Sequence, residues 1–489
     1  MRPSGGVIAG VGVAQVLCAL AGGGTEWWKS GGAMDVTQAA WLAGIGLFTS
    51  MVGLGLHAYG DRRETERLTR REAVLAVVVI WTLAGIFGAL PFVLIAGLGP
   101  VDAFFETMSG LTTTGTTVIL DIEERLSPPL LLWRSTISWL GGMGIVVLFV
   151  AVFPSVGAGS KHMFKGEVTG TSAEGLKPRI AKTSFALWRL YAGLTALYAV
   201  LLVACGIDPF EAVCHAFTTL STSGFSTRDA SLAAFQSPAV EYVTSVFMIV
   251  GSINFALFFA IMRHRSLKPV LRSTELKVFF ALLALATALT MVGTLEVYDY
   301  DVERTFRMAF FHVASCMSST GYFIGHEPAR YPSAVLGVWL ALMVVGGCAG
   351  STAGGMKVER VVLLAKQSWA EIRRSFRPAI VKTVRMGRVA VPADVMSDVA
   401  AFFVLYVAVI VAGIFFVSLT EGVDVPTAFA ATLACVAGTG PAPWLSATLH
   451  GTFASFSDLG KLFLVLVMML GRLELFTIFA LLVPDFWRR

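Results

Sequence analysis

Long stretches without a charged residue constrain this chain more than any other feature. Nine such stretches, and a tenth interrupted only by Arg472 and Glu474, are long enough to cross a bilayer, which needs about 20 helical residues. They cover 3–25, 36–60, 73–101, 135–160, 190–207, 242–262, 278–295, 331–356, 399–420 and 462–484. Only 14% of the residues are charged and 56% are hydrophobic. The sequence therefore predicts an all-α integral membrane protein with ten spans.

Two further stretches need interpretation. Residues 425–457 also lack charge, but "GTGPAP" lies at their centre, so we expect a re-entrant segment. The amino terminus resembles a secretory signal, yet its single Arg2 and the lack of a convincing cleavage site favour a retained first helix.

Basic residues occur in alternate loops and predict the orientation of the chain. They concentrate in 60–72, 161–182, 263–277, 357–398 and at the two termini. Because a Lys/Arg bias marks the cytoplasmic side, both termini are expected there. The opposite face is acidic and would attract cations.

A 13-residue motif occurs four times, each time between two apolar stretches. The copies are "AFFETMSGLTTTG" (Ala103–Gly115), "AVCHAFTTLSTSG" (Ala212–Gly224), "AFFHVASCMSSTG" (Ala309–Gly321) and "AFAATLACVAGTG" (Ala428–Gly440). Repeats in phase with their flanking spans predict four tandem units of helix, pore helix and helix around a pseudo-fourfold pore. The predicted divisions are 1–60 (two additional N-terminal helices), 73–160, 183–263 and 276–360 (pore units 1 to 3), 361–395 (cytoplasmic loop) and 396–489 (pore unit 4).

The motif is too short to span the membrane. A helix of about ten residues reaches only about 15 Å, and such a segment is tolerated at membrane depth where protein or a water-filled cavity surrounds it. Each short helix would direct the negative end of its dipole toward the centre. The backbone beyond would offer carbonyl groups to a desolvated cation. The predicted filter residues are Thr113, Thr114, Gly115, Thr222, Ser223, Gly224, Ser319, Thr320, Gly321, Gly438, Thr439 and Gly440.

With these motifs the chain resembles the Trk/Ktr/HKT superfamily of potassium transporters. Supporting motifs are "GALPF" at 88–92, "GSINF" at 251–255, "GGCAGSTAGGMKVER" at 346–360 and "GRLELF" at 471–476. Two extra amino-terminal spans favour the Trk-type branch. The resemblance implies a homodimer in the bacterial inner membrane, with one pore per subunit and a TrkA-like cytosolic nucleotide-binding regulatory subunit. It also implies K⁺ as the transported ion when all four filter positions are glycine, with no organic cofactor on this chain and no nucleic-acid partner.

The glycine-rich stretch at the end of the third unit is the predicted gate. Small residues there would break the inner helix, and the resemblance assigns the resulting strand a gating role; close helix packing is the alternative. A phosphate-binding loop is disfavoured because Lys357 is followed by Val358 rather than Ser or Thr. The predicted gate residues are Gly346, Gly347, Gly350, Ser351, Thr352, Gly354, Gly355 and Arg472.

For several polar residues, the sequence allows two interpretations. Arg472 either faces the pore and raises the barrier to a cation, or pairs with Glu474 or backbone carbonyls. His215 and His312 share a repeat position with Glu106 and Ala431, which favours packing behind the filter over ion coordination. The basic loop 357–388 either rests on lipid headgroups or docks the regulatory subunit.

Other function classes fit less well. A membrane enzyme would need a catalytic motif such as HExxH or GxSxG, and neither occurs in the sequence. An alternating-access transporter predicts two inverted repeats rather than four copies. Within the favoured class, a sodium-permeable cation transporter or one coupled to H⁺ or Na⁺ by symport remains open.

Overall fold

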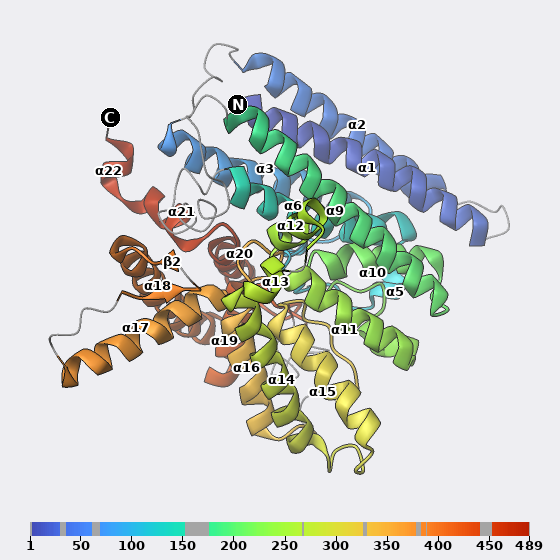
Figure 1. Cartoon of the computed structure of the whole chain (residues 1–489). Helices are drawn as coiled ribbons and strands as arrows, with labels where there is room; N and C mark the ends of the chain where they lie inside the picture. The colour runs from blue at the N-terminus through green and yellow to red at the C-terminus, as the bar shows by residue number, and fades with distance from the viewer. Residues whose placement is uncertain are drawn as a thin grey trace.

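The computed structural model describes residues 2–29, 36–60, 69–151, 176–266, 268–325, 330–377, 383–387, 389–440 and 452–488. In these ranges nearly all regular structure is helical (Figure 1). One small antiparallel hairpin also occurs there, formed by β1 (Arg385–Met386) and β2 (Val389–Ala390).

The helices follow the predicted fourfold plan. The outer helices of units 1 to 4 are α3 (Arg70–Leu94), α9 (Leu176–Ala204), α14 (Thr274–Thr294) and α18 (Ala393–Glu421). The short pore helices are α4 (Pro100–Leu111), α10 (Pro209–Leu220), α15 (Val302–Met317) and α19 (Val425–Ala437). The inner helices are α6 (Pro128–Ala151), α11 (Pro238–Ser252) with α12 (Phe255–His264), α16 (Ser333–Val345), and α20 (Asp458–Arg472) with α21 (Leu475–Phe479).

The remaining helices flank these units. Two long helices, α1 (Arg2–Lys29) and α2 (Val36–Tyr59), precede unit 1, and α17 (Val358–Phe376) links units 3 and 4. The short elements are α5 (Ile122–Arg125), η3 (Ser231–Phe235), α13 (Lys268–Arg272), η7 (Ala480–Leu482) and α22 (Pro484–Trp487).

The apolar helices confirm the prediction of an all-α membrane protein. Six described helices (α1, α2, α3, α9, α14 and α18) are long and apolar enough to cross a bilayer, or eight spans if each bent helix pair counts as one. The other two predicted spans contain α6 and the shorter α16. The stretch 425–457 begins with the 13-residue α19, too short to span, and residues 441–451 lie outside the described ranges.

Within the described residues, three of the four inner helices are interrupted, although the sequence predicted a break only in the third unit. In unit 2 the chain bends by 91° between α11 and α12, and in unit 4 by 116° between α20 and α21. Asn254 begins α12 anew, because its side chain accepts a hydrogen bond from Ala256 N at 2.9 Å. Glu474 adopts φ +68° at the break in unit 4. In unit 3, α16 ends at Val345 and the glycine-rich stretch follows.

The pore helices start with acidic residues, which explains the Asp found near the start of each repeat. Asp208 and Asp301 cap α10 and α15 by accepting backbone hydrogen bonds, and Asp102 lies in the first turn of α4. Asp424 occupies the cap position of α19. Negative side chains at these positions favour helix starts and interact favourably with the positive end of each helix dipole.

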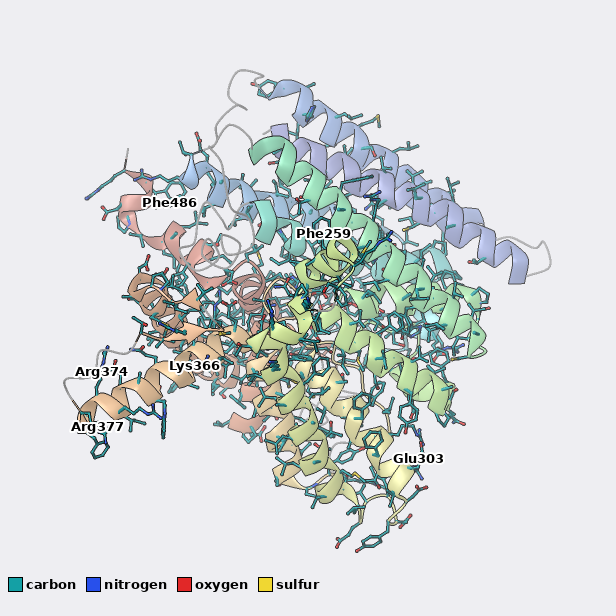
Figure 2. All side chains as sticks on the ribbon, viewed as in Figure 1. Phe259, Glu303, Lys366, Arg374, Arg377 and Phe486 are labelled. Atoms are coloured by element: carbon teal, nitrogen blue, oxygen red, sulfur yellow. The ribbon has the colours of Figure 1, made fainter. Side chains whose placement is uncertain are left out.

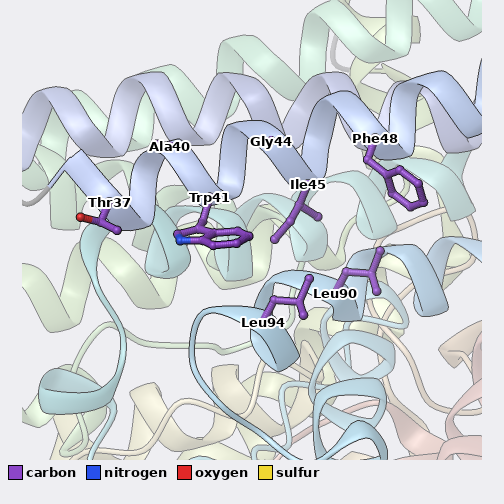
Figure 3. A pocket seen from close by; sticks show the side chains of 8 residues that line it. All are labelled: Thr37, Ala40, Trp41, Gly44, Ile45, Phe48, Leu90 and Leu94. Carbon is purple, nitrogen blue, oxygen red and sulfur yellow. The ribbon is translucent and has the colours of Figure 1, made fainter.

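The first two helices pack on each other through glycine and lie along one edge of the molecule (Figure 1). Side chains at Gly5, Gly12, Gly46 or Gly53 would meet the backbone of the partner helix. Close backbone approach of this kind lets membrane helices associate without a hydrophobic driving force. An apolar groove of about 520 Å³ separates α2 from α3, lined by Thr37, Ala40, Trp41, Gly44, Ile45, Phe48, Leu90 and Leu94 (Figure 3).

The α1–α2 contact gives a stability prediction. An added Cβ at Gly53 would lie 2.7 Å from Gly5 O and closer still to the backbone of Ala9, so Gly53→Ala should destabilise the protein by about 1–3 kcal/mol. Thermal unfolding of the purified protein in detergent measures this. Gly55→Ala is the control, because nothing lies within 4 Å of a Cβ at Gly55. A higher helix propensity should leave that variant as stable as the wild type or slightly more so, and equal effects of both substitutions would contradict the glycine contact.

Candidate ion-binding site

All four pore helices end with the same hydrogen bond. The amide of the twelfth motif residue donates to the carbonyl of the seventh at 2.8 to 3.0 Å in every copy. The pairs are Thr114 with Ser109, Ser223 with Thr218, Thr320 with Ser315, and Thr439 with Ala434. This bond reverses the chain at the helix end, as in related C-terminal caps. The fourth copy therefore keeps the geometry of the others despite its divergent sequence.

The backbone conformation of the filter segment also repeats. The eleventh and thirteenth residues have positive φ in every copy: 54° and 79° at Thr113 and Gly115, 56° and 72° at Thr222 and Gly224, 55° and 81° at Ser319 and Gly321, 61° and 80° at Gly438 and Gly440. Positive φ is unusual for threonine, and such strain gathers at functional sites. It also explains why glycine fits at position 438, where the other three copies have Thr or Ser.

The four segments close into a ring. A Cβ placed on Gly115 would overlap Ser223 O, one on Gly224 would overlap Thr320 O, and one on Gly321 would overlap Thr439 O. The ring closes because a Cβ on Gly440 would lie 2.8 Å from Thr114 O. Each last glycine thus faces the carbonyl of the residue before the corresponding glycine in the next unit. The structure thus joins the last two residues of all four predicted filter segments in one ring, and the remaining filter residue of each segment precedes them directly in the chain.

The hydroxyl groups of the segment are used to hold it in place. Thr112 Oγ1 lies 2.8 Å from Thr114 Oγ1, and Ser318 Oγ lies 2.7 Å from Thr320 Oγ1. Ser109 Oγ donates to Thr116 O and Ser315 Oγ donates to Tyr322 O, both at 2.6 Å. These contacts engage the hydroxyl groups of Thr114 and Thr320, two of the twelve predicted filter residues.

The glycine-rich stretch of unit 3 lies against the helix ends beneath this ring. Thr352 Oγ1 is 2.9 Å from both Leu220 O and Gly251 O in unit 2, and Gly354 N donates to Ser319 Oγ in unit 3. Gly355 N donates to Ala437 O in unit 4 at 2.9 Å. The stretch therefore joins three units at the end of the filter.

The other predicted gate residues shape this stretch. Gly346, Gly350 and Gly355 have positive φ of 69°, 71° and 76°, which glycine adopts without steric cost. Ser351 Oγ donates to Cys348 O at 2.6 Å. Side chains at Gly347 and Gly354 would collide with Ala353 and Ala437 O. An irregular, closely packed segment of turns replaces the helix at this point.

Arg472 binds backbone carbonyls, the second interpretation that the sequence left open. Its Nη1 donates to Thr352 O at 2.7 Å and its Nη2 to Gly141 O of unit 1 at 3.4 Å. Glu474 pairs with Arg360 at 2.7 Å. Arg472 also lines a small cavity of about 20 Å³ together with Gly438 and Gly354. The guanidinium thus lies close to Gly438 of the ring while it anchors the glycine-rich stretch.

Two charged groups at this stretch were not predicted as gate residues from the sequence. Glu275 accepts a hydrogen bond from Ala349 N at 2.6 Å, and Lys357 Nζ donates to Ala353 O. Both side chains are buried. The available signal was their position, since Glu275 starts an apolar span and Lys357 follows the glycines directly.

Comparison with known proteins agrees with this geometry. A family model described as TrkH, cation transport protein, matches residues 46–488. The chain belongs to the TrkH family. TrkH proteins are transporters rather than enzymes, which confirms the prediction of a non-enzymatic membrane protein.

Relatives and a solved structure cover nearly all of the chain. The "Trk system potassium uptake protein TrkH" of Halomonas elongata is 37% identical over 92% of this chain and 93% of the relative. TrkH of Escherichia coli strain K12 is 37% identical over 88% of each. The crystal structure of the potassium transporter TrkH from Vibrio parahaemolyticus matches with a TM-score of 0.86 and 32% identity over 100% of both chains.

The contacts of Thr352 predict a specific stability loss. Thr352→Val keeps the shape of the side chain but removes the hydroxyl donor from Leu220 O, while Gly251 O keeps the backbone amide of Thr352 as a donor. The loss of the hydroxyl should cost about 1–3 kcal/mol. Thermal unfolding in detergent measures it. Thr420→Val is the control, because Thr420 Oγ1 bonds only within its own helix, to Phe416 O. An equal, small effect of both substitutions would show that Thr352 does not anchor the stretch.

Proposed function

We propose that this chain mediates K⁺ uptake across the bacterial inner membrane through a filter of backbone carbonyls. The observation that carries the proposal is the closed ring in which each filter glycine faces a carbonyl of the next unit. Relatives over most of the chain are named potassium uptake proteins, which supports K⁺ as the substrate.

The filter would hold K⁺ with the twelve residues predicted from the repeats. Carbonyl oxygens of Thr113, Thr114 and Gly115, and of their counterparts in the other units, would replace the hydration shell of the ion. The negative ends of four pore-helix dipoles add to the attraction. The filter segments consist only of Thr, Ser and Gly, so they carry no charged side chain that would bind the ion in place of the carbonyl groups.

The glycine-rich stretch would act as the gate. Its place under the ring, fastened by Thr352, Ser319 and Arg472, supports this role. A movement of α17 would be transmitted to the stretch, because α17 begins at Val358, directly after it. We propose that a cytosolic nucleotide-binding regulatory subunit supplies that change, as the word "system" in the names of the relatives suggests.

Surface charge and repeat order support the rest of the architecture. Arg374 and Arg377 lie at the free end of α17, away from the helical body (Figure 2), where lipid headgroups or the regulatory subunit would bind. We propose that both termini are cytoplasmic, that the chain divides at the boundaries predicted from the repeats, and that two copies form a homodimer with one pore each.

Rubidium-86 uptake into proteoliposomes, with sodium as competitor, tests the function. We expect Rb⁺ uptake that K⁺ blocks and Na⁺ does not. Gly115→Ser should weaken this discrimination, because its Cβ must displace Ser223 O. Gly440→Ser is the graded comparison, since its Cβ would lie 2.8 Å from the nearest carbonyl oxygen, a milder contact. Sodium uptake equal to that of Rb⁺ in the wild type would favour the sodium-permeable alternative, and unaltered selectivity of Gly115→Ser would remove Gly115 from the filter.

Arg472 gives a second functional prediction. Arg472→Ala removes a buried positive charge close to Gly438 of the ring and takes away the side-chain donor to Thr352 O. Rb⁺ uptake should therefore rise several-fold. Arg488→Ala, which removes an exposed positive charge near the end of the chain, should leave uptake unchanged. An unchanged rate for a folded Arg472→Ala protein would argue against a barrier at this residue.

A further inference from the structure

In three of the four pore motifs, the fourth residue makes an equivalent contact behind the filter. Glu106 accepts a hydrogen bond from Val118 N at 3.0 Å, His215 Nε2 lies 3.0 Å from Ser226 Oγ, and His312 Nε2 accepts from Ile324 N at 3.4 Å. All three side chains are buried. Each therefore links its pore helix to the chain that leaves the filter, and the corresponding residue of unit 4, Ala431, has no polar group for this contact.

Glu106 differs from the two histidines because it belongs to a buried ion pair. Arg134 Nε of α6 lies 2.7 Å from Glu106 Oε1, and the exposed fractions of the two side chains are 3% and 0%. Thr117 Oγ1 donates to the same carboxylate at 3.0 Å. With these donors around it and its charge matched, the carboxylate is a structural acceptor and not an ion ligand.

Arg134 carries the link across the boundary between units 1 and 2. Its Nη1 donates to Ser226 O at 2.9 Å, and its guanidinium lies 3.6 Å from the centre of the Phe225 ring. Phe225 and Ser226 directly follow Gly224. A planar guanidinium makes both contacts at once, which the ammonium group of lysine does not.

The same cluster reaches unit 4. Phe453 N donates to Thr117 O at 2.8 Å, while the hydroxyl of Thr117 is held by Glu106. The exits of the filter segments of units 1 and 2, and Phe453 of unit 4, are therefore fastened around one ion pair. The segments it joins start one or two residues after Gly115 and Gly224, the two glycines whose strands touch at this boundary.

We infer that Glu106 and Arg134 are positioning residues for ion selectivity. Their contacts fix the separation of the filter segments of units 1 and 2, so the carbonyl ring keeps one diameter. The inference rests on the proposed filter and adds its specificity determinant. Loosening the ion pair lets the filter segments adjust to a smaller ion. Discrimination against Na⁺ is therefore lost before the protein fails to fold.

The test uses conservative variants and two measurements. Glu106→Asp and Arg134→Lys keep both charges but shorten the carboxylate or remove the planar fork. We expect each to reduce the preference for Rb⁺ over Na⁺ in uptake about tenfold, the change produced by about 1.4 kcal/mol. The second measurement is the difference in the unfolding midpoint of purified protein in KCl and in NaCl, which should shrink in both variants.

A matched control separates positioning from general stability. Glu241 and Arg307 form another poorly exposed ion pair, between α11 of unit 2 and α15 of unit 3. Glu241→Asp should lower the unfolding midpoint yet keep the wild-type ion preference. The inference is overturned if Glu106→Asp and Arg134→Lys behave as this control does, losing stability alone.

The double variant Glu106→Gln/Arg134→Met is a control for misfolding, because it leaves no unpaired buried charge as a single substitution would. It removes both charges, and we expect a folded protein whose ion preference stays reduced; restored preference would overturn the inference. A wild type with a K⁺-specific rise in its unfolding midpoint but no Rb⁺ uptake would refute transport and leave the positioning role standing. If the wild type shows neither, both proposals fall.

Discussion

The close approach of backbone to backbone at four glycines is the constraint on which the rest of the structure depends. Each of these glycines lies against a carbonyl oxygen of the neighbouring unit, where a side chain has no room. Only glycine combines this contact with φ near +80°. The tandem repeat supplies four such segments from one polypeptide, and the pore helices, inner helices and glycine-rich stretch are arranged to hold them.

Polar groups at membrane depth are satisfied by these same parts. A backbone that leaves its helix in the bilayer needs partners from the protein or from a water-filled cavity. Arg472 binds the carbonyls of Thr352 and Gly141, and Glu474 binds Arg360. The breaks in three inner helices therefore form one connected region beneath the filter, and a gate made from it would move as a unit.

The four units are similar in backbone but differ in the side chains at their boundaries. Ion pairs join units 1 and 2 (Glu123 with Arg228), units 2 and 3 (Glu241 with Arg307), and units 4 and 1 (Asp102 with Lys461). Behind the filter, Glu106, His215 and His312 make equivalent contacts through different chemistry. A symmetric ring can thus be built from non-identical units, which permits one boundary to tune selectivity.

The sequence by itself determined the membrane class, the spans, the four repeats and the twelve segment residues, because hydrophobic length and internal repetition are local properties. It also predicted the break after α16, since the glycines there are adjacent in the chain. Tertiary structure alone decided the partners of Arg472, the link between Glu106 and Arg134, and the breaks in units 2 and 4. These depend on groups that are distant in sequence, such as Arg472 and Gly141, and the identity of a buried charge does not reveal which carbonyl lies opposite it in the folded protein.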